Sequence, residues 1–498
     1  MKVLQLGPDN WADHYQLPAE MEWEFNDFPP KKKHSYDVVI VTGDNQLTDE
    51  DWQKLQWLVD PYHVLFSPNT ADQLTSAARH FLKCQAAAPI KDDPQTVIGF
   101  LPRRYFFGQS GIRFLPSALM PLMDRLTAYE MLDSGHVVLK TDTHDQWLNV
   151  GTYKSGLFLD PHKLIKLWLA YQAEGLAVRL RVFIQPAGGD GDPNASFVLD
   201  ASSAEELQLP IKVVDYNRYA NISLEVKGAG TLKLGILHSR WGREGYGEFI
   251  AGGQRIVDPA TREDIAYFCN PGDLQPPLNV YFSGARSLEG FEAFPMFRYA
   301  KAPAILFTDM RLEVGQFYTT SHMEEEIKRV IRDYLKQLGF DESQLIMNGI
   351  SMGTYPAIRL GAQLGAYAIN VAKPLAGLGL IAQRGRLERP FGFETIFDID
   401  NQLVDRLDEE QLSQLDKRFW EDFNQCDLSK TRLFVAYMKD DDYDNQAIEH
   451  FRHSPAVARA REFASRGFAG HHNDDPSVNY WFANRLHQML TNDFGRKE

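Results

Sequence analysis

The chain has 498 residues, a formal net charge of −15 and three cysteines. This length suggests about three domains, since a domain usually has about 100–200 residues. The negative charge argues against a nucleic-acid partner, because no basic run is long enough to offset it. The cysteines, Cys84, Cys269 and Cys426, are far apart and odd in number. They fit a reducing compartment and argue against a disulfide framework.

The sequence shows no segment for membrane insertion or secretion. The opening MKVLQLGPDNW has only a short apolar run before Gly7-Pro8, too short for a signal peptide. Elsewhere no uninterrupted apolar run approaches the roughly 18 residues of a membrane helix. We therefore expect a cytoplasmic protein without an integral membrane segment.

Residues 1–125 alternate between strand and helix patterns. Val3–Leu6, Asp37–Thr42 and His63–Ser67 are short apolar strands, and a helix is expected over about 70–83. Such alternation predicts a small N-terminal α/β domain with a parallel sheet.

Residues 126–270 contain many short strand patterns without helices between them. This predicts a β-rich, sandwich-like middle domain that could bind a carbohydrate or a partner. The loop His238–Gly247 combines aromatic, basic and flexible residues, so a sugar-binding surface and a loop packed between domains are both open. The expected strands are 137–140, 147–153, 166–171, 177–184, 196–199, 211–214, 221–226 and 231–238.

The α/β pattern returns over residues 271–498. Strands are expected at 278–282 and 304–307, and a helix from Ser321 to Gly339 begins with a capping box of Ser321 and Glu324. An acidic, helical insertion over about 383–427 precedes a last strong strand and a terminal helix. We predict an α/β fold whose C-terminal domain is α/β-hydrolase-like.

The most informative stretch is residues 344–365, QLIMNGISMGTYPAIRLGAQLG. A short apolar strand runs into Gly349-Ile350-Ser351-Met352-Gly353, and a helix follows. Strand, G-x-S-x-G and helix, in this order, predict a nucleophile elbow with Ser351 as the nucleophile, which the insertion over 383–427 could cover. The alternative interpretation is a glycine-rich strand-to-helix turn without a nucleophile.

A catalytic serine needs an acid and a histidine later in the chain. Strand 431–438 leads into a run of aspartates, in which Asp441 lies about three residues beyond the strand, where hydrolases place the acid; Asp440 is the alternate. Two adjacent histidines, His471 and His472, precede the terminal helix. Their spacing leaves open which of them is the base, because neighbours in an extended loop point in opposite directions.

The oxyanion donors expected from this pattern are backbone N–H groups. One belongs to Met352, and the other comes from the loop Ser283-Gly284-Ala285, where we select Gly284. A metal site at His471, His472, Asp474 and Asp475 is disfavoured, because the helical ligand spacing and distant partner ligands are missing. We expect no metal and no bound cofactor.

Several motifs together resemble a known family, the second of the three Asp proteins of the accessory Sec system. The resemblance spans the whole chain, and its middle and C-terminal motifs are specific. They are MKVLQLGPDNW (1–11), HSRWGREGYGEFIAGGQRIVD (238–258), VYFSGARSLEGFEAF (280–294), NGISMGTYPA (348–357), YMKDDDYD (437–444) and GHHNDD (470–475).

The resemblance implies a function and a site. It implies a cytoplasmic protein that acts with the other two Asp proteins and the accessory Sec motor ATPase to export serine-rich repeat glycoprotein adhesins. It also implies a triad of Ser351, Asp441 and His472 that O-acetylates N-acetylglucosamine on the adhesin, with an acetyl donor that the sequence does not reveal. The histidine before Asn-Asp in the family's pattern favours His472.

Two other functions fit the same sequence. A carbohydrate esterase or deacetylase would use the same triad with water as the acceptor. A non-catalytic adaptor of the export complex would bind its partners through the β-rich middle domain. Fold alone does not choose among them.

Overall fold

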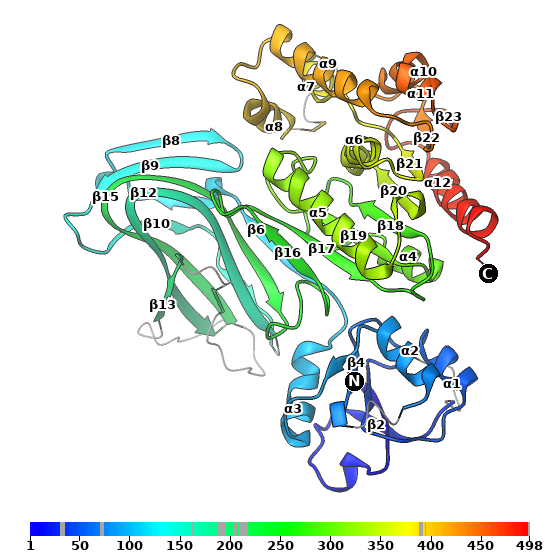
Figure 1. The fold of residues 1–498 in the computed structure, drawn as a ribbon. Helices are drawn as coiled ribbons and strands as arrows, with labels where there is room; N and C mark the ends of the chain where they lie inside the picture. Colours follow the sequence, from blue (N-terminus) through cyan, green and yellow to red (C-terminus); the bar gives the residue numbers. More distant parts are fainter. Residues whose placement is uncertain are drawn as a thin grey trace.

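The computed structural model describes residues 1–29, 35–69, 74–161, 163–186, 196–202, 207–208, 218–387, 392–393 and 395–496. These residues build three sheets, which lie in three separate parts of the molecule (Figure 1). The expected strand at 211–214 lies outside the described residues. In the described part, no helix combines the length and apolar character needed to cross a membrane.

The N-terminal sheet is parallel, with the strand order β2-β1-β3-β4-β5. Its central strands are almost fully apolar and buried on both faces, as expected for a parallel sheet covered by helices. The strands are β1 (Lys2–Leu6), β2 (Glu22–Phe25), β3 (Val38–Val41), β4 (Val64–Phe66) and β5 (Ala88–Pro89), and the helices are α1 (Asp49–Leu55), α2 (Ser76–Cys84) and α3 (Pro94–Arg104).

The middle part is a single ten-stranded antiparallel sheet that is strongly curved (Figure 1). Two very long strands form its centre, β12 (Leu164–Pro186) and β15 (Arg218–Gly242), which pair with each other along their length. The other strands are β6 (Gly111–Phe114), β7 (Leu119–Pro121), β8 (Ala128–Asp133), β9 (His136–Asp142), β10 (Leu148–Tyr153), β11 (Leu157–Leu159), β13 (Ser196–Asp200) and β14 (Leu207–Gln208).

The expected short strands at 137–140, 147–153 and 196–199 are present within β9, β10 and β13. The expected pairs 166–171 with 177–184 and 221–226 with 231–238 are instead the two long strands β12 and β15, and glycines explain why. Gly175 and Gly228 have φ values of +71° and +116°. Gly228 of β15 pairs with Leu176 of β12, and Gly175 lies beside this pair, where the register of the two strands shifts. A Cβ at either position would come within 2.3 Å of a carbonyl oxygen on the facing strand. These glycines bend two continuous strands at a bulge. In the sequence, the same glycines look like turn residues between shorter strands.

The C-terminal part contains an eight-stranded sheet with the order β16-β17-β19-β18-β20-β21-β22-β23. In this order, each strand from β19 to β23, with β18 among them, is parallel to the next. Strand β17 pairs antiparallel with β19. They are β16 (Gln254–Val257), β17 (Asp264–Asn270), β18 (Leu278–Phe282), β19 (Ala304–Asp309), β20 (Leu345–Ile350), β21 (Ala368–Ala372), β22 (Arg432–Met438) and β23 (Glu462–Phe468).

Helices cover both faces of this sheet. One face packs against α5 (Ser321–Leu338) and α6 (Thr354–Leu364), and the other against α4 (Phe294–Ala300) and α12 (Ser477–Gln488). Helix α5 ends at Gly339 as expected, but Thr320, one residue before the expected position, caps its beginning. Two further helices are α10 (Ala447–His453) and α11 (Pro455–Ala458).

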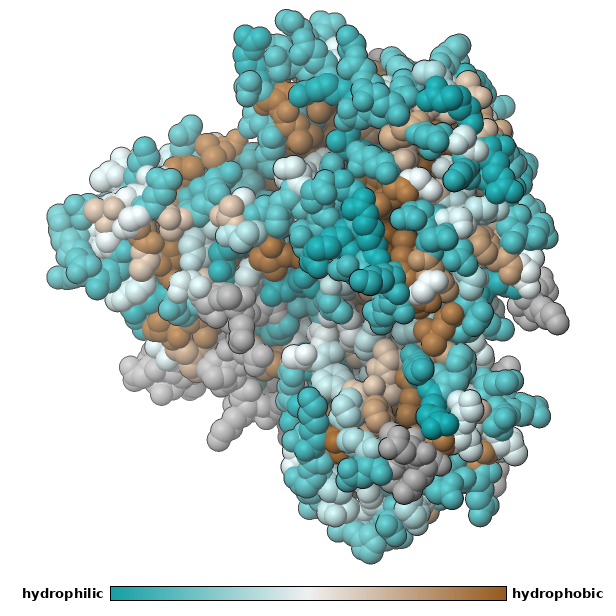
Figure 2. Space-filling view, viewed as in Figure 1, coloured by the Kyte–Doolittle hydropathy of each residue, from teal (hydrophilic) through white to brown (hydrophobic). Residues whose placement is uncertain are grey.

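The acidic insertion forms a helical cap at one end of the sheet (Figure 1). We use the name cap for residues 378–425, which contain α7 (Leu378–Leu387), α8 (Ile396–Leu403) and α9 (Glu409–Gln425). A hydrogen bond from Ser134, at the turn between β8 and β9, to Asp398 joins the cap to the curved sheet. Figure 2 shows that the viewed face of the molecule is mostly hydrophilic, with apolar side chains in small areas.

The three sheets do not divide the chain at the expected domain boundaries of 125 and 270. Strands β6 and β7 come before residue 126, yet they pair with the curved sheet. Strands β16 and β17 come before residue 271, yet they belong to the C-terminal sheet. The mixed α/β class is confirmed, and the switch between sheets occurs near residues 105–111 and 242–254.

Candidate active site

The expected elbow lies where β20 meets α6. Ser351 follows the strand directly and has a φ of +55°, a strained value for a residue with a side chain. A Cβ on Gly349 would lie 2.1 Å from the carbonyl oxygen of Gly353, and one on Gly353 would lie 2.0 Å from that of Phe282. Both positions therefore require glycine, and the tight turn presents the Ser351 side chain at the end of the sheet.

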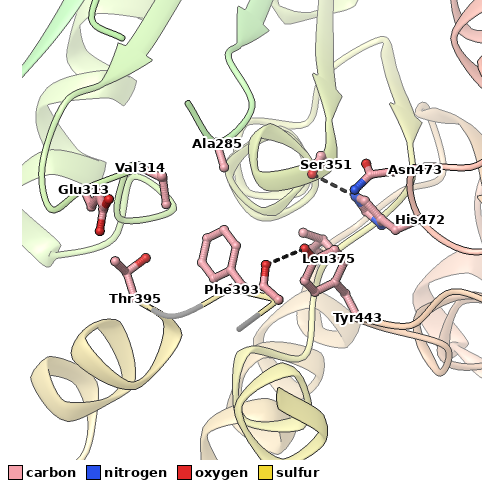
Figure 3. A pocket seen from close by; sticks show the side chains of 11 residues that line it. Ala285, Glu313, Val314, Ser351, Leu375, Phe393, Thr395, Tyr443, His472 and Asn473 are labelled. Atoms are coloured by element: carbon pink, nitrogen blue, oxygen red, sulfur yellow. Dashed lines mark hydrogen bonds between the residues drawn. The ribbon is translucent and has the colours of Figure 1, made fainter. Parts of the chain in front are cut away.

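Ser351, His472 and Asp441 form a continuous hydrogen-bonded chain, of which Figure 3 shows the link between Ser351 and His472. The Ser351 Oγ lies 2.9 Å from His472 Nε2, and His472 Nδ1 lies 2.9 Å from Asp441 Oδ2. His472 is 2% exposed and Asp441 is 3% exposed. A carboxylate at Nδ1 keeps the proton on that nitrogen, so that Nε2 is the acceptor for the serine hydroxyl.

The surrounding loop fixes this geometry. The N–H of Tyr443 donates to Asp441 Oδ1 at 2.9 Å, and the N–H of His472 donates to Asp442 Oδ1 at 3.0 Å. The ring of Tyr443 stands edge-on to the imidazole, with 4.8 Å between ring centres. The two loops that supply the acid and the base are therefore tied together.

The two alternates lie away from the chain of hydrogen bonds. Asp440 is exposed, and the exposed His471 pairs with Asp474 on its own loop. The adjacent histidines do point in different directions. Among the described residues, no three His, Cys, Asp or Glu side chains are grouped so that they could hold a metal ion.

The selected oxyanion donor Gly284 is engaged elsewhere. Its N–H donates to Glu292 Oε2 at 3.0 Å, so it does not point at a reacting carbonyl in this structure. The next residue in the same loop, Ala285, lines the pocket at Ser351. Met352 follows the serine as expected. The identity of the second oxyanion donor therefore stays a prediction, and Ala285 is the residue of this loop that borders the pocket.

Ser351 and His472 open into a pocket of about 340 Å³. This size is within the usual range of about 300–1,000 Å³ for small-ligand sites. The cap contributes Gly392, Phe393 and Thr395 to its wall, and the hydroxyl of Tyr443 donates to the carbonyl of Gly392. The expected cover over the elbow is present. The other lining residues are Ala285, Glu313, Val314, Leu375, Tyr443 and Asn473 (Figure 3).

Sequence reasoning missed Glu313 and Thr395. Neither lies in a recognisable motif, and the pocket takes them from two segments, after β19 and at the start of α8. Only the folded arrangement brings them together.

The loop at 238–247 does not line the pocket, so it gives no support to the sugar-binding interpretation. His238 and Arg240 are 2% and 1% exposed, and both bind the buried carboxylate of Glu289. Arg240 also makes a two-pronged contact to Asp264, at 2.7 and 2.9 Å. Burial alone would raise the pKa of Glu289, but Arg240 and His238 outweigh it and hold the pKa at about 2. Residues 238–242 of this stretch are the end of β15, which packs against the C-terminal part through Glu289 and Asp264. The loop that follows contacts the segment after α3 through Arg243, which donates to the carbonyls of Arg104 and Phe106.

Arg113 extends this buried charged layer to the pocket. It lies on β6 and is 3.5 Å from Glu289. Its guanidinium also donates to the carbonyls of Arg286 and Glu313, which lie in two loops that border the pocket. The charged layer, which we define as Arg113, His238, Arg240, Asp264 and Glu289, therefore holds loops of the site in place.

A buried acid lies inside the cap. Asp400 is fully buried, and within the described residues neither of its carboxylate oxygens has a hydrogen-bond partner. Burial raises its pKa to about 8, and the neighbouring Asp416 contributes to this rise. In the unfolded chain the pKa is about 3.9. Between these values the folded protein binds more protons than the unfolded one, so its stability falls as the pH rises through this range.

Replacing Asp400 with asparagine should relieve this cost. We expect the free energy of unfolding to rise by roughly 1–3 kcal/mol at pH 9, with a smaller change at pH 5, because an uncompensated buried polar group costs about that much. Urea unfolding at both pH values measures the difference. Glu409→Gln, which changes an exposed acid of α9, is the control and should show no such pH-dependent gain. An equal gain at pH 5 and pH 9 for Asp400→Asn would contradict the raised pKa of Asp400.

Comparisons with known proteins give the family. Residues 1–496 match the family described as the accessory Sec system GspB-transporter, which is the family of the second Asp protein. The chain is 33% identical over 518 residues to the second accessory Sec system Asp protein of Streptococcus gordonii, a match that covers 100% of this chain and 99% of that protein. It is 35% identical over 398 residues to the protein of the same description from Staphylococcus aureus, with 78% and 75% covered.

A solved structure is also similar over the whole chain. It is a chain of the Glycosylation Associate Protein (Gap123) complex from Streptococcus agalactiae, with 30% identity and a TM-score of 0.87. The similarity covers 100% of this chain and 99% of that one. The protein described here therefore belongs to the family of the second Asp protein of the accessory Sec system.

Proposed function

We propose that this protein is a serine-dependent O-acetyltransferase of the accessory Sec system, which acetylates N-acetylglucosamine on serine-rich repeat glycoprotein adhesins and supports their export. The observation that carries the proposal is the hydrogen-bonded chain from Ser351 through His472 to Asp441 at a covered pocket. Acyl transfer through a covalent intermediate needs this arrangement of nucleophile, base and orienting acid.

In the first half of the proposed reaction, His472 Nε2 takes the proton of the Ser351 hydroxyl as Oγ attacks the carbonyl carbon of an activated acetyl donor. The negative charge that develops on the carbonyl oxygen is received by the backbone N–H groups of Met352 and Ala285. The bond to the leaving group then breaks, and that group takes the proton from His472. Asp441 stabilises the imidazolium, and acetyl-Ser351 remains.

In the second half, a sugar hydroxyl replaces the donor. His472 removes its proton, the hydroxyl oxygen attacks the acetyl carbonyl, and Ser351 leaves with the proton that His472 returns. The product is an acetylated sugar, and no resident cofactor or metal takes part. Water competes for the same intermediate at about 55 M, so the acceptor has to be held productively while the cap limits water.

The proposal places this reaction in the cytoplasm, within an export complex. The partners would be the other two Asp proteins, the accessory Sec motor ATPase and the serine-rich glycoprotein. The whole-chain similarity to a chain of the Gap123 complex supports the association with other proteins of this kind.

The experiment that tests the proposal is a product analysis by mass spectrometry. The protein receives a small acetyl ester with or without a peptide that carries N-acetylglucosamine. We expect slow hydrolysis alone and an acetylated sugar when the peptide is present. Rapid hydrolysis without any acetylated sugar, even when the partner proteins are added, would favour the esterase. If the ester is not turned over and Ser351 is not acylated, the result would favour the adaptor.

A further inference from the structure

Thr395 presents an unused hydroxyl to the pocket. The residue is 3% exposed, and among the described residues no group hydrogen-bonds to its Oγ1. It precedes α8 at the N-cap position, where a threonine side chain usually accepts an N–H of the first helical turn, yet no such bond forms here. A buried hydroxyl without a partner is rare in proteins and needs a reason. Because Thr395 lines the pocket, a ligand can provide the missing partner.

Glu313 lies in the same part of the pocket. Glu313 is exposed, and its backbone carbonyl accepts a hydrogen bond from the Arg113 guanidinium. Figure 3 shows Glu313 and Thr395 on one side of Phe393, whereas Ser351 and His472 lie on the other side. The pocket therefore has two polar ends that are separated by an aromatic wall.

We infer that Thr395 and Glu313 form a second polar subsite, which binds hydroxyl or amide groups of the acceptor sugar while its reacting hydroxyl lies at His472. This inference rests on the proposed function and specifies how the acceptor is selected. A carboxylate accepts hydrogen bonds from such groups, and the threonine hydroxyl donates or accepts one. The charge of Glu313 favours a neutral, hydroxyl-rich ligand over an anionic one.

The subsite also explains how a sugar competes with water. A water molecule reaches His472 without using the distant polar end, so the contacts at Thr395 and Glu313 favour only the larger acceptor. Binding at both ends raises the effective concentration of the reacting hydroxyl at the acetyl group. A site built to hydrogen-bond a ligand strongly disfavours ligands that leave its polar groups unpaired.

Binding can be measured without any acyl chemistry. In the full-length Ser351→Ala protein, the methyl glycoside of N-acetylglucosamine is titrated, and its Kd is determined by ligand-observed NMR. Adding Thr395→Val, which keeps the shape and removes the hydroxyl, should weaken binding about tenfold, whereas Thr395→Ser should keep most of it. Glu313→Gln should weaken binding about 10- to 100-fold, because it removes a charged acceptor. Glu409→Gln on α9 is the control with the same chemical change.

Activity gives the second measurement. With Ser351 intact, Thr395→Val should raise the KM for the sugar-bearing peptide about tenfold, and the loss should fall on KM rather than on kcat. The thermal midpoint should stay the same or rise, because an unpaired buried hydroxyl is removed. This shows that weaker binding does not come from misfolding.

The outcomes separate the two proposals. Unchanged sugar binding in both Thr395→Val and Glu313→Gln would overturn the subsite. An equal loss of fluorophosphonate labelling at Ser351 would also overturn it, since Thr395 would then act on the triad. Weakened sugar binding in these variants, together with the absence of an acyl-enzyme when the protein with Ser351 intact receives the acetyl ester, would support the subsite and reject the transferase.

Discussion

Replacing Ser351 with alanine should abolish both acetyl transfer and labelling by a fluorophosphonate. The Oγ atom, 2.9 Å from His472 Nε2, is the nucleophile in the proposed reaction, and alanine offers none. In a protease triad the loss of the serine lowers kcat by up to about 10⁶-fold, and we expect an effect of similar size here. The measurement is the rate of sugar acetylation, together with mass spectrometry of the labelled protein.

The Ser351→Ala protein should remain folded. Serine and alanine differ by one oxygen atom, which faces the pocket. The positive φ at this position strains both residues to a similar extent. Thermal unfolding therefore checks that the fold is intact. Labelling that persists in the Ser351→Ala protein would show that a different residue is the nucleophile.

Replacing Asp441 with asparagine should give the second largest effect, a loss of about 10⁴-fold in kcat, as the equivalent change does in a protease triad. The Asp441 Oδ1 atom already accepts the N–H of Tyr443, so the asparagine carbonyl should keep that position. Its amide nitrogen would then face His472 Nδ1 and force the proton onto the wrong ring nitrogen. The rate of sugar acetylation as a function of pH measures this loss.

The neighbouring aspartates provide matched controls. Asp440 is exposed, so Asp440→Asn should leave the rate close to that of the unchanged protein. Asp442 accepts the backbone N–H of His472, so Asp442→Asn should cause a smaller loss than Asp441→Asn. A severe loss in Asp440→Asn, with Asp441→Asn active, would reject the geometry as the basis of catalysis.

The sequence was most informative where the local backbone constrains the choice of residue. Gly349 and Gly353 flank Ser351 because neighbouring backbone leaves no room for a Cβ, and that requirement is visible in the sequence itself. The positions of the acid and the base follow from the order of strands in a parallel sheet. The selection of His472 over His471 needed the family pattern, because spacing alone does not distinguish adjacent histidines.

The sequence was least informative where distant segments decide the structure. Gly175 and Gly228 look like turn residues, but the facing strand makes them bends within two long strands. Gly284 and Ala285 are adjacent, and only the carboxylate of Glu292, which is eight residues from Gly284, distinguishes their roles. Thr395 enters the pocket through the folding of the cap, for which no local signal exists.

The charged layer determines which fragments of the chain can fold separately. A fragment that begins at residue 271 would lack β16, β17, Arg113 and Arg240, and it would keep Glu289 without its cations. Removing one partner of a buried ion pair costs about 3–5 kcal/mol, a large part of the roughly 5–15 kcal/mol that stabilises a typical domain. We therefore expect the curved sheet and the C-terminal sheet to unfold together, as one cooperative unit. In evolutionary terms, the curved sheet could not have been exchanged as an independent module without rebuilding the loops around the serine.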